Sequence, residues 1–179
     1  MQEQFLEKIK DIDPNSIYYI DETGSDQVYH SHYGYSKQGE RCIAPEAGIK
    51  GERISLVGGY NKNVLIAPME ISGTLKKIGF THWFSQWLLP LLPAFSVIIM
   101  DNASIHDKIE LSMLAAKANC QIIFLPPYSP QYNKIETLWA NLKNLLRHLM
   151  TNCALKFREA FEFCIAKFSN IISETRTCI

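Results

Sequence analysis

The sequence predicts an α/β domain in which one mixed sheet carries helices on both faces. Apolar runs rich in tyrosine and β-branched residues, separated by turn residues, occupy residues 17–68 and are typical of antiparallel strands. From residue 73 onward, segments with helical periodicity alternate with short apolar runs, the order that builds parallel strands with crossover helices. A length of 179 residues and an apolar content of 47% suit one globular domain with its own core.

The amino-terminal part is predicted to hold one helix and four strands. Residues 1–13 are charged and amphipathic, which favours a lead-in helix within residues 1–16 and indicates no signal peptide. Turn residues at 23–26 predict a hairpin between the first two strands, and Gly58 and Gly59 lie between the next two. The predicted strands are residues 17–21, 27–31, 53–57 and 64–68.

The remaining elements alternate between helices and strands. Ser104 followed three residues later by Asp107 is a capping-box pattern that predicts a helix start. Apolar residues recur at spacings of three and four over residues 135–149, which predicts a long amphipathic helix after the proline-rich loop 126–130. The other predicted helices are residues 73–92, 104–119 and 155–172, and the predicted strands are residues 95–100 and 121–125.

One uncharged stretch has the length of a membrane span. Residues 78–100 contain no Asp, Glu, Lys or Arg. Pro90 and Pro93 interrupt this stretch, and scattered polar residues dilute its apolar character. We therefore predict a helix, a proline turn and a buried strand there, and no membrane partner.

Composition limits the classes of function. Lys and Arg total 18 and Asp and Glu total 18, so the chain has no net charge and any DNA contact must come from local patches. The five cysteines lie far apart without a Cys-x-x-Cys pair. This pattern argues against a zinc site and a secreted disulfide framework, and it indicates thiols in a reducing compartment, the cytoplasm.

Three acidic residues stand where an apolar strand or a proline-rich loop gives way to the next element. They are Asp21, Asp101 and Glu136. Strand ends of an α/β sheet deliver side chains to one crevice, so these carboxylates can form one cluster of negative charge. Such a cluster needs divalent cations. Oxygen-only ligands suit Mg²⁺ or Mn²⁺, and a pair of such ions is the usual device for in-line attack on a phosphodiester.

Each carboxylate also has a structural interpretation. Asp21 can begin a turn, and Asp101 can solvate a strand end. Asn133 is a candidate N-cap that puts Glu136 at the third helical position, where glutamate reaches back to the cap. Capping and metal binding do not exclude one another.

Four stretches of the chain carry a family resemblance. They are Tyr-Ile-Asp-Glu-Thr-Gly (19–24), Lys-Gly-Glu-Arg-Ile-Ser-Leu-Val-Gly (50–58), Met-Asp-Asn-Ala-Ser-Ile-His (100–106) and Leu-Pro-Pro-Tyr-Ser-Pro-Gln-Tyr-Asn-Lys-Ile-Glu-Thr-Leu-Trp-Ala-Asn-Leu-Lys (125–143). With these motifs, and with 34 residues between Asp101 and Glu136, the sequence resembles the catalytic domain of DDE transposases of the bacterial insertion-sequence branch related to the mariner group.

The resemblance implies an RNase H-like fold with a mixed five-stranded sheet, and it implies DNA strand cleavage and strand transfer during transposition. It assigns two Mg²⁺ or Mn²⁺ ions to Asp21, Asp101 and Glu136. One ion activates water or a DNA 3′-hydroxyl, and the other stabilises the leaving oxygen. The implied partners are the transposon ends and the target DNA, with a homodimer in the complex that brings two ends together.

Several further residues are secondary candidates. Asn102 and His106 are candidates for orienting a phosphate or a metal-bound water, although His106 in a first helical turn is equally explained as a surface residue. Glu22 alternates to the other side of the strand from Asp21, which favours a structural role. The candidate DNA contacts are Tyr128, Lys143 and Arg147, each explained equally well by packing or solvation, and Lys134, which opposes the helix dipole unless it contacts phosphate.

The chain departs from the family pattern in two places. Lys134 stands where the family usually has proline, which suits a helix start because its missing amide hydrogen needs no partner. The family's amino-terminal helix-turn-helix modules have no counterpart before residue 17, so we expect a catalytic core at 17–150, a C-terminal helix within 151–179, and DNA recognition by a separately encoded part. Three origins are consistent with a catalytic domain of this kind: a split-frame product, a decayed copy and an excised domain. The alternatives to an active transposase are an inactive remnant that binds DNA or assembles, and an RNase H-like nuclease.

Overall fold

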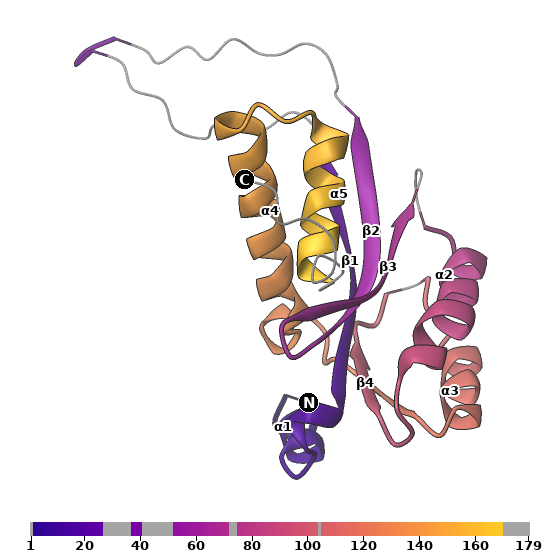
Figure 1. The fold of residues 1–179 in the computed structure, drawn as a ribbon. Helices are drawn as coiled ribbons and strands as arrows, with labels where there is room; N and C mark the ends of the chain where they lie inside the picture. The colour runs from indigo at the N-terminus through magenta and orange to yellow at the C-terminus, as the bar shows by residue number, and fades with distance from the viewer. Residues whose placement is uncertain (1, 27–36, 41–51, 72–74, 104, 170–179) are drawn as a thin grey trace.

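A mixed sheet forms the centre of the molecule (Figure 1). The computed structural model describes residues 2–26, 37–40, 52–71, 75–103 and 105–169. The strand order is β3-β2-β1-β4-β5. The strands are β1 (Ile17–Asp26), β2 (Arg53–Asn61), β3 (Val64–Ile71), β4 (Val97–Met100) and β5 (Gln121–Phe124). β1 pairs antiparallel with β2 and parallel with β4, so the antiparallel and parallel halves of the sheet meet at β1.

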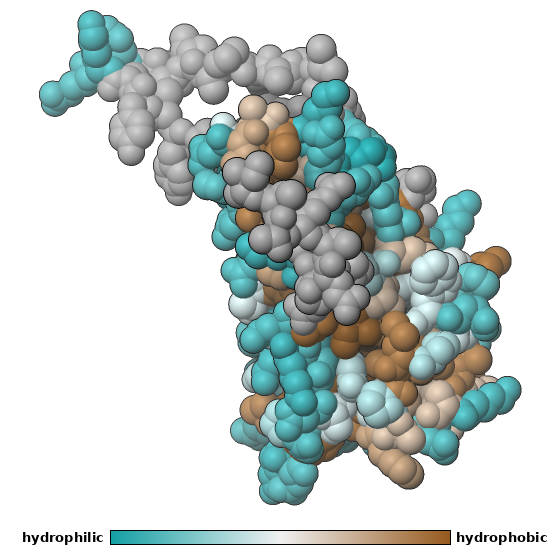
Figure 2. All heavy atoms as spheres, in the orientation of Figure 1, coloured by the Kyte–Doolittle hydropathy of each residue, from teal (hydrophilic) through white to brown (hydrophobic). Residues whose placement is uncertain are grey.

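Helices cover both faces of this sheet, as the sequence predicts. α1 (Gln2–Ile9), α4 (Ile135–Asn152) and α5 (Phe157–Phe168) lie on one face, and α2 (Lys77–Trp83) and α3 (Lys108–Lys117) lie on the other (Figure 1). β1 supplies both cores, because successive strand residues point to opposite faces. Ile17 and Tyr19 join the core under α4 and α5, whereas Tyr18 and Ile20 join the core under α2 and α3. The outer sides of α1 and α4 are mostly hydrophilic, and hydrophobic side chains show between the two helical layers (Figure 2).

The first predicted hairpin is wrong, because β1 continues through the predicted turn to Asp26. Thr23 pairs with Leu56 and Ser25 pairs with Ile54 in β2, and both side chains of these turn-type residues are buried. A distant strand therefore overrides the local turn preference. Residues 27–31, the predicted second strand, lie outside the described residues.

The hairpin of β2 and β3 is confirmed with longer strands than predicted. β2 runs through Gly58 and Gly59 to Asn61 instead of stopping before them. The turn comes at Lys62 and Asn63, whose φ angles of 48° and 65° are left-handed, as a two-residue hairpin turn requires.

The helices around β4 differ from the predicted ones at their ends. α2 begins at Lys77, and the chain continues through a π-helical turn (Phe84–Leu88) and a 3₁₀ turn (Leu89–Leu91). α3 begins at Lys108 rather than at residue 104, because the carboxylate of Asp107 accepts from the backbone N–H groups of Ile109 and Glu110.

The structure also describes the last helix, the uncharged stretch and two buried cysteines. α5 ends at Phe168, inside the predicted 155–172. Within the described ranges, no helix has the length and apolar character needed to cross a membrane. Cys120 and Cys164 are buried free thiols, and burial raises the pKa of Cys164 to about 11, which leaves it unreactive at neutral pH.

Candidate active site

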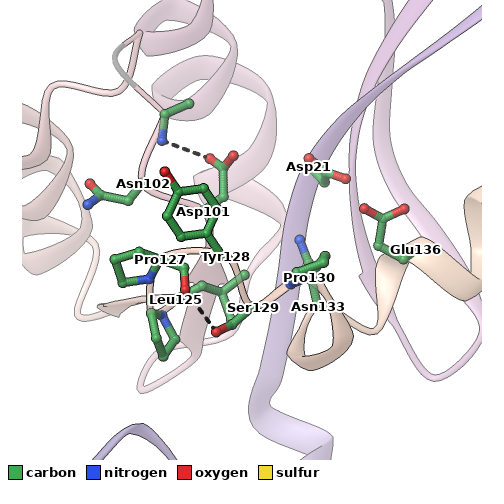
Figure 3. A pocket seen from close by; sticks show the side chains of 12 residues that line it. Asp21, Asp101, Asn102, Leu125, Pro127, Tyr128, Ser129, Pro130, Asn133 and Glu136 are labelled. Carbon is green, nitrogen blue, oxygen red and sulfur yellow. Dashed lines mark hydrogen bonds between the residues drawn. The ribbon is translucent and has the colours of Figure 1, made fainter. Parts of the chain in front are cut away.

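The three predicted carboxylates line one pocket of about 410 Å³ (Figure 3). Ile20 of β1 and Met100 of β4 are paired in parallel register, so the next residue of each strand, Asp21 and Asp101, arrives at the same edge of the two strands. Glu136 comes from the first turn of α4. In the view of Figure 3, Asp21 lies between the other two carboxylates.

The start of α4 is fixed to β1 by Asn133. Its buried side-chain amide donates to the backbone carbonyl of Ile20 at 3.3 Å. The predicted N-cap role of Asn133 is therefore wrong: the N-cap position is Lys134, and its side chain makes no capping hydrogen bond. Because Ile20 immediately precedes Asp21, this bond holds the first turn of α4, and Glu136 with it, beside the first aspartate.

Asp21 is largely buried and is held by a tryptophan. The indole N–H of Trp139 donates to Asp21 Oδ2 at 3.2 Å. The pKa of Asp21 is raised to about 7, chiefly by burial; the charges of Glu136 and Asp101 contribute to the rise, and hydrogen bonds from the Glu22 backbone and from Trp139 oppose it. Two like charges close to a buried carboxylate favour either a proton or a cation at this position.

Trp139 is a site residue that the sequence analysis missed. Periodicity places it only in the apolar stripe of the helix, whereas its indole reaches from α4 to β1. Gly58 pairs with Asp21 across the sheet and lies beside the indole: a Cβ there would be in ordinary contact with Trp139 Cη2 at 3.4 Å but would clash with Leu65 Cδ1 at 2.7 Å. A signal was present, because a buried indole N–H needs an acceptor and Asp21 is an acceptor.

Asp101 has different surroundings, and they favour its ionised form. The backbone N–H of Ala103 donates to Asp101 Oδ1 at 3.1 Å, and Nδ1 of His106 lies 3.1 Å from the same oxygen. The imidazole of His106 lowers the pKa of Asp101, and the Ala103 amide adds to this effect against burial. His106 precedes α3, and only 6% of its side chain is exposed, so the surface interpretation of this residue is wrong.

The rim of the pocket includes two other predicted residues. Asn102 and Tyr128 line it, and Tyr128 is fully exposed with a φ of 53°. The adjacent Ser129 is buried, donates to the carbonyl of Pro127 at 3.1 Å and accepts from Gln2 of α1 at 3.1 Å. The lead-in helix thus braces the loop that presents Tyr128 at the pocket.

The three basic candidates lie outside the pocket lining. Nζ of Lys134 lies 5.8 Å from the centroid of the Tyr19 ring. Lys143 is half-buried on α4, and Arg147, one turn further along, donates to Asn144 at 3.1 Å. Lys134 stands at the start of α4, next to the turn that carries Glu136, whereas Lys143 and Arg147 follow the helix away from the carboxylates, so any contact these two make with DNA lies beyond the reacting phosphate.

The donor set suits a hard divalent cation in an open site. Within the described part of the chain, no three His, Cys, Asp or Glu side chains lie close enough together to enclose a metal ion. Mg²⁺ seldom needs such an enclosure, because it keeps several waters and is bound by one or two carboxylates together with substrate phosphate. Three carboxylates around an open pocket, one of them with a raised pKa, fit that mode of binding.

Comparisons with known proteins identify the family and the fold. Residues 16–157 match the model of the family described as DDE superfamily endonuclease. No curated protein matches the sequence. Among solved structures, the Mos1 transposase paired-end complex with left transposon end aligns with a TM-score of 0.63 and 17% identity, over 94% of this chain and 56% of that chain.

Two further structures extend the comparison. The mariner Mos1 paired-end complex with Mg gives a TM-score of 0.60 at 16% identity, covering 93% of this chain and 60% of that one. The catalytic core domain of BIV integrase gives 0.51 at 14% identity, covering 92% and 88%. These likenesses confirm the predicted RNase H-like fold, the mixed five-stranded sheet of transposase and integrase catalytic cores. The chain spans 56% of the transposase chain in the first of these complexes.

Proposed function

This chain belongs to the DDE superfamily endonucleases, and on that basis we propose that it is a transposase catalytic domain that cuts DNA strands and transfers their ends. The observation that carries the proposal is the convergence of Asp21, Asp101 and Glu136 on one pocket from β1, the end of β4 and α4. The sheet, and the hydrogen bond from Asn133 at the start of α4 to Ile20, hold these carboxylates in place before any ligand binds.

Asp21, Asp101 and Glu136 are the residues that would hold two divalent ions, Mg²⁺ or Mn²⁺. When bound, such ions make water or a DNA 3′-hydroxyl a nucleophile near neutral pH and offset the charge that develops on the phosphate. The Mg-containing Mos1 complex supports the use of a divalent ion. The chain's own part is to position the ligands: Trp139 holds one oxygen of Asp21, and Ala103 holds one oxygen of Asp101.

DNA is the proposed partner, and Tyr128 and Asn102 at the rim are its proposed first contacts. The DNA-bound Mos1 structures support this choice of partner. Cutting two transposon ends together calls for a homodimer during the reaction. We assign residues 17–150 to the catalytic core and residues 151–179 to a C-terminal segment with α5, and we assign recognition of the transposon ends to a separate helix-turn-helix part.

The test is nicking of supercoiled plasmid at low salt with Mg²⁺, Mn²⁺ or a chelator. We expect metal-dependent nicking that is abolished in Asp101→Asn and in Glu136→Gln, because each change removes a charged ligand. Asp26→Asn is the matched control, because Asp26 lies at the exposed far end of the strand that carries Asp21. This variant should nick DNA at the wild-type rate. Nicking that survives in Asp101→Asn would refute the site. Cleavage of RNA–DNA hybrids alone would favour the nuclease alternative.

A further inference from the structure

His106 is buried beside the candidate metal site, and its Nδ1 lies at hydrogen-bond distance from Asp101 Oδ1, although at an unfavourable angle. Neither of its ring nitrogens has a partner of normal geometry among the described residues. Its nearest polar neighbours on the two sides are carboxylates: Nδ1 lies 3.1 Å from Asp101 Oδ1, and Nε2 lies 4.0 Å from Glu22 Oε1. A buried imidazole with a carboxylate on each side is a costly arrangement if packing is its only purpose.

Packing fixes where the imidazole can point. The Phe80 ring of α2 lies 4.2 Å from it, centroid to centroid, and only 6% of the His106 side chain is exposed. Glu22 is on the opposite face of β1 from Asp21 and is half-buried, so it reaches the imidazole from behind the pocket. Glu22 was predicted to have a structural role, and in the structure its carboxylate faces the second ring nitrogen of His106.

Both polar neighbours of Asp101 act on the same oxygen. The backbone N of Ala103 and Nδ1 of His106 each lie 3.1 Å from Oδ1, whereas among the described residues Oδ2 has no hydrogen bond or ion pair. The terminal torsion of aspartate has a broad, two-fold preference, so a carboxylate held at one oxygen by a single donor can still swing. Two groups placed against Oδ1 restrict that swing more than one group would, and they leave Oδ2 for the pocket that Asp101 lines.

We propose that His106, backed by Glu22, is a positioning residue that holds the Asp101 carboxylate with Oδ2 presented to a divalent cation. The proposal rests on the proposed function, since it takes Asp101 as a metal ligand. Partners of metal ligands act in this way in other sites, and their loss typically lowers metal affinity or activity about 10- to 100-fold. A packing role alone makes a different prediction, because any aromatic ring of similar size would then serve.

The test compares three replacements of His106 in the full chain, with Mn²⁺ alone as the probe. His106→Asn keeps a donor near the position of Nδ1, His106→Gln places one near Nε2, and His106→Phe keeps the ring without a donor. Bound Mn²⁺ is measured without DNA by the loss of the electron paramagnetic resonance signal of the free ion. Nicking rates against Mn²⁺ concentration are measured separately, and thermal unfolding checks the fold of each variant. His82→Phe is the control, because His82 is an exposed histidine on α2.

We expect His106→Phe to weaken Mn²⁺ binding about 10- to 100-fold and to raise the half-saturating Mn²⁺ concentration for nicking more than it lowers the maximal rate. His106→Asn should recover most of the affinity, His106→Gln less of it, and Glu22→Ala should show a smaller loss of affinity. Equal Mn²⁺ affinity in His106→Phe and wild type, or equal affinity in the Asn and Gln variants, would overturn the inference and leave the proposed function standing. Equal Mn²⁺ affinity in Asp101→Asn and wild type would overturn both this inference and the proposed function.

Discussion

Two aspartates of one pocket are held in opposite electrostatic states. Burial raises the pKa of Asp21 to about 7, whereas the imidazole of His106 and the Ala103 amide lower the pKa of Asp101. Without a metal, the pocket therefore accepts its first proton at Asp21 and keeps Asp101 charged. A divalent ion at Asp21 would have to displace that proton near neutral pH, so we expect metal binding to tighten as the pH rises through about 7.

The raised pKa of Asp21 also predicts how the stability of the metal-free protein depends on pH. In the unfolded chain this carboxyl titrates near 3.8, and in the folded protein near 7, so the folded state holds the proton more tightly. The stability present below pH 4 should therefore be lost as the pH rises to about 7. At about 1.4 kcal/mol for each pKa unit, the upper limit of this loss is roughly 4 kcal/mol.

Asp21→Asn isolates this effect, because the amide stays neutral at every pH. Urea unfolding with a chelator present should show the variant gaining on the wild type between pH 5 and pH 8. Asp101→Asn should not show this gain, because the pKa of Asp101 is lowered rather than raised. Wild-type and Asp21→Asn proteins with parallel pH profiles would contradict the burial of a charged Asp21.

At the level of single residues, the acidic side chains of the site could be predicted from the sequence, but the residues that hold them in place could not. Strand ends and a conspicuous loop mark Asp21, Asp101 and Glu136 locally. Trp139 and Asn133 act only through β1, more than 110 residues away along the chain. Their roles depend on tertiary contacts that neither periodicity nor capping rules encode.

Among the elements, the start of α4 decides where Glu136 points. Lys134 at the N-cap has φ of −63°, and its backbone N–H has no hydrogen-bond partner among the described residues. Asn133 before it is extended, with φ of −93° and ψ of 97°, which a following proline tolerates. The backbone here already has the conformation that proline imposes, although the residue is lysine.

Lys134→Pro should accordingly stabilise the protein relative to Lys134→Ala by about 0.4–1 kcal/mol, because proline restricts the unfolded chain. The alanine reference removes the same contact of Lys134 with the Tyr19 ring. Chemical denaturation measures the difference.

Lys156 provides the matched control for this substitution. It is the N-cap of α5 with a similar φ of −67°, but its backbone N–H donates to Glu159 at 3.4 Å. Lys156→Pro should destabilise the protein relative to Lys156→Ala. If both prolines shift stability in the same direction, the explanation based on the free amide at 134 is wrong.

The sequence predicted most elements and misplaced those whose limits depend on partners. Helical periodicity located α4, and the apolar runs located β4 and β5, since each signal lies within the element itself. β1 was predicted too short because residues 23–26 have turn-type side chains, yet pairing with β2 buries two of them. The start of α3 was missed because Asp107 itself provides the cap.

For the whole molecule, charge balance governs how DNA can bind. With 18 basic and 18 acidic residues, the chain has no net attraction for a polyanion, so affinity must come from local cations and from metal in the pocket. Lys143 and Arg147 on α4 are the proposed source, because they continue along the helix that carries Glu136.

We expect Lys143→Ala and Arg147→Ala each to weaken binding to unrelated DNA sequences alike, and each to reduce the slope of log affinity against log salt by about one. Fluorescence anisotropy with labelled duplexes across a salt series measures both quantities. Lys117→Ala is the control, since Lys117 lies at the end of α3 on the opposite face of the sheet. An unchanged salt slope in the α4 variants would place the DNA path elsewhere.

Asp21, Asp101 and Glu136 are proposed to bind the divalent cations of the reaction together, and anomalous X-ray scattering from Mn²⁺-soaked crystals would locate these ions. We expect manganese peaks inside the pocket, in contact with carboxylate oxygens of these three residues, and no such peaks in crystals of Asp21→Asn. A pocket without manganese at a concentration that supports nicking, or manganese bound only at other acidic residues, would contradict this proposal.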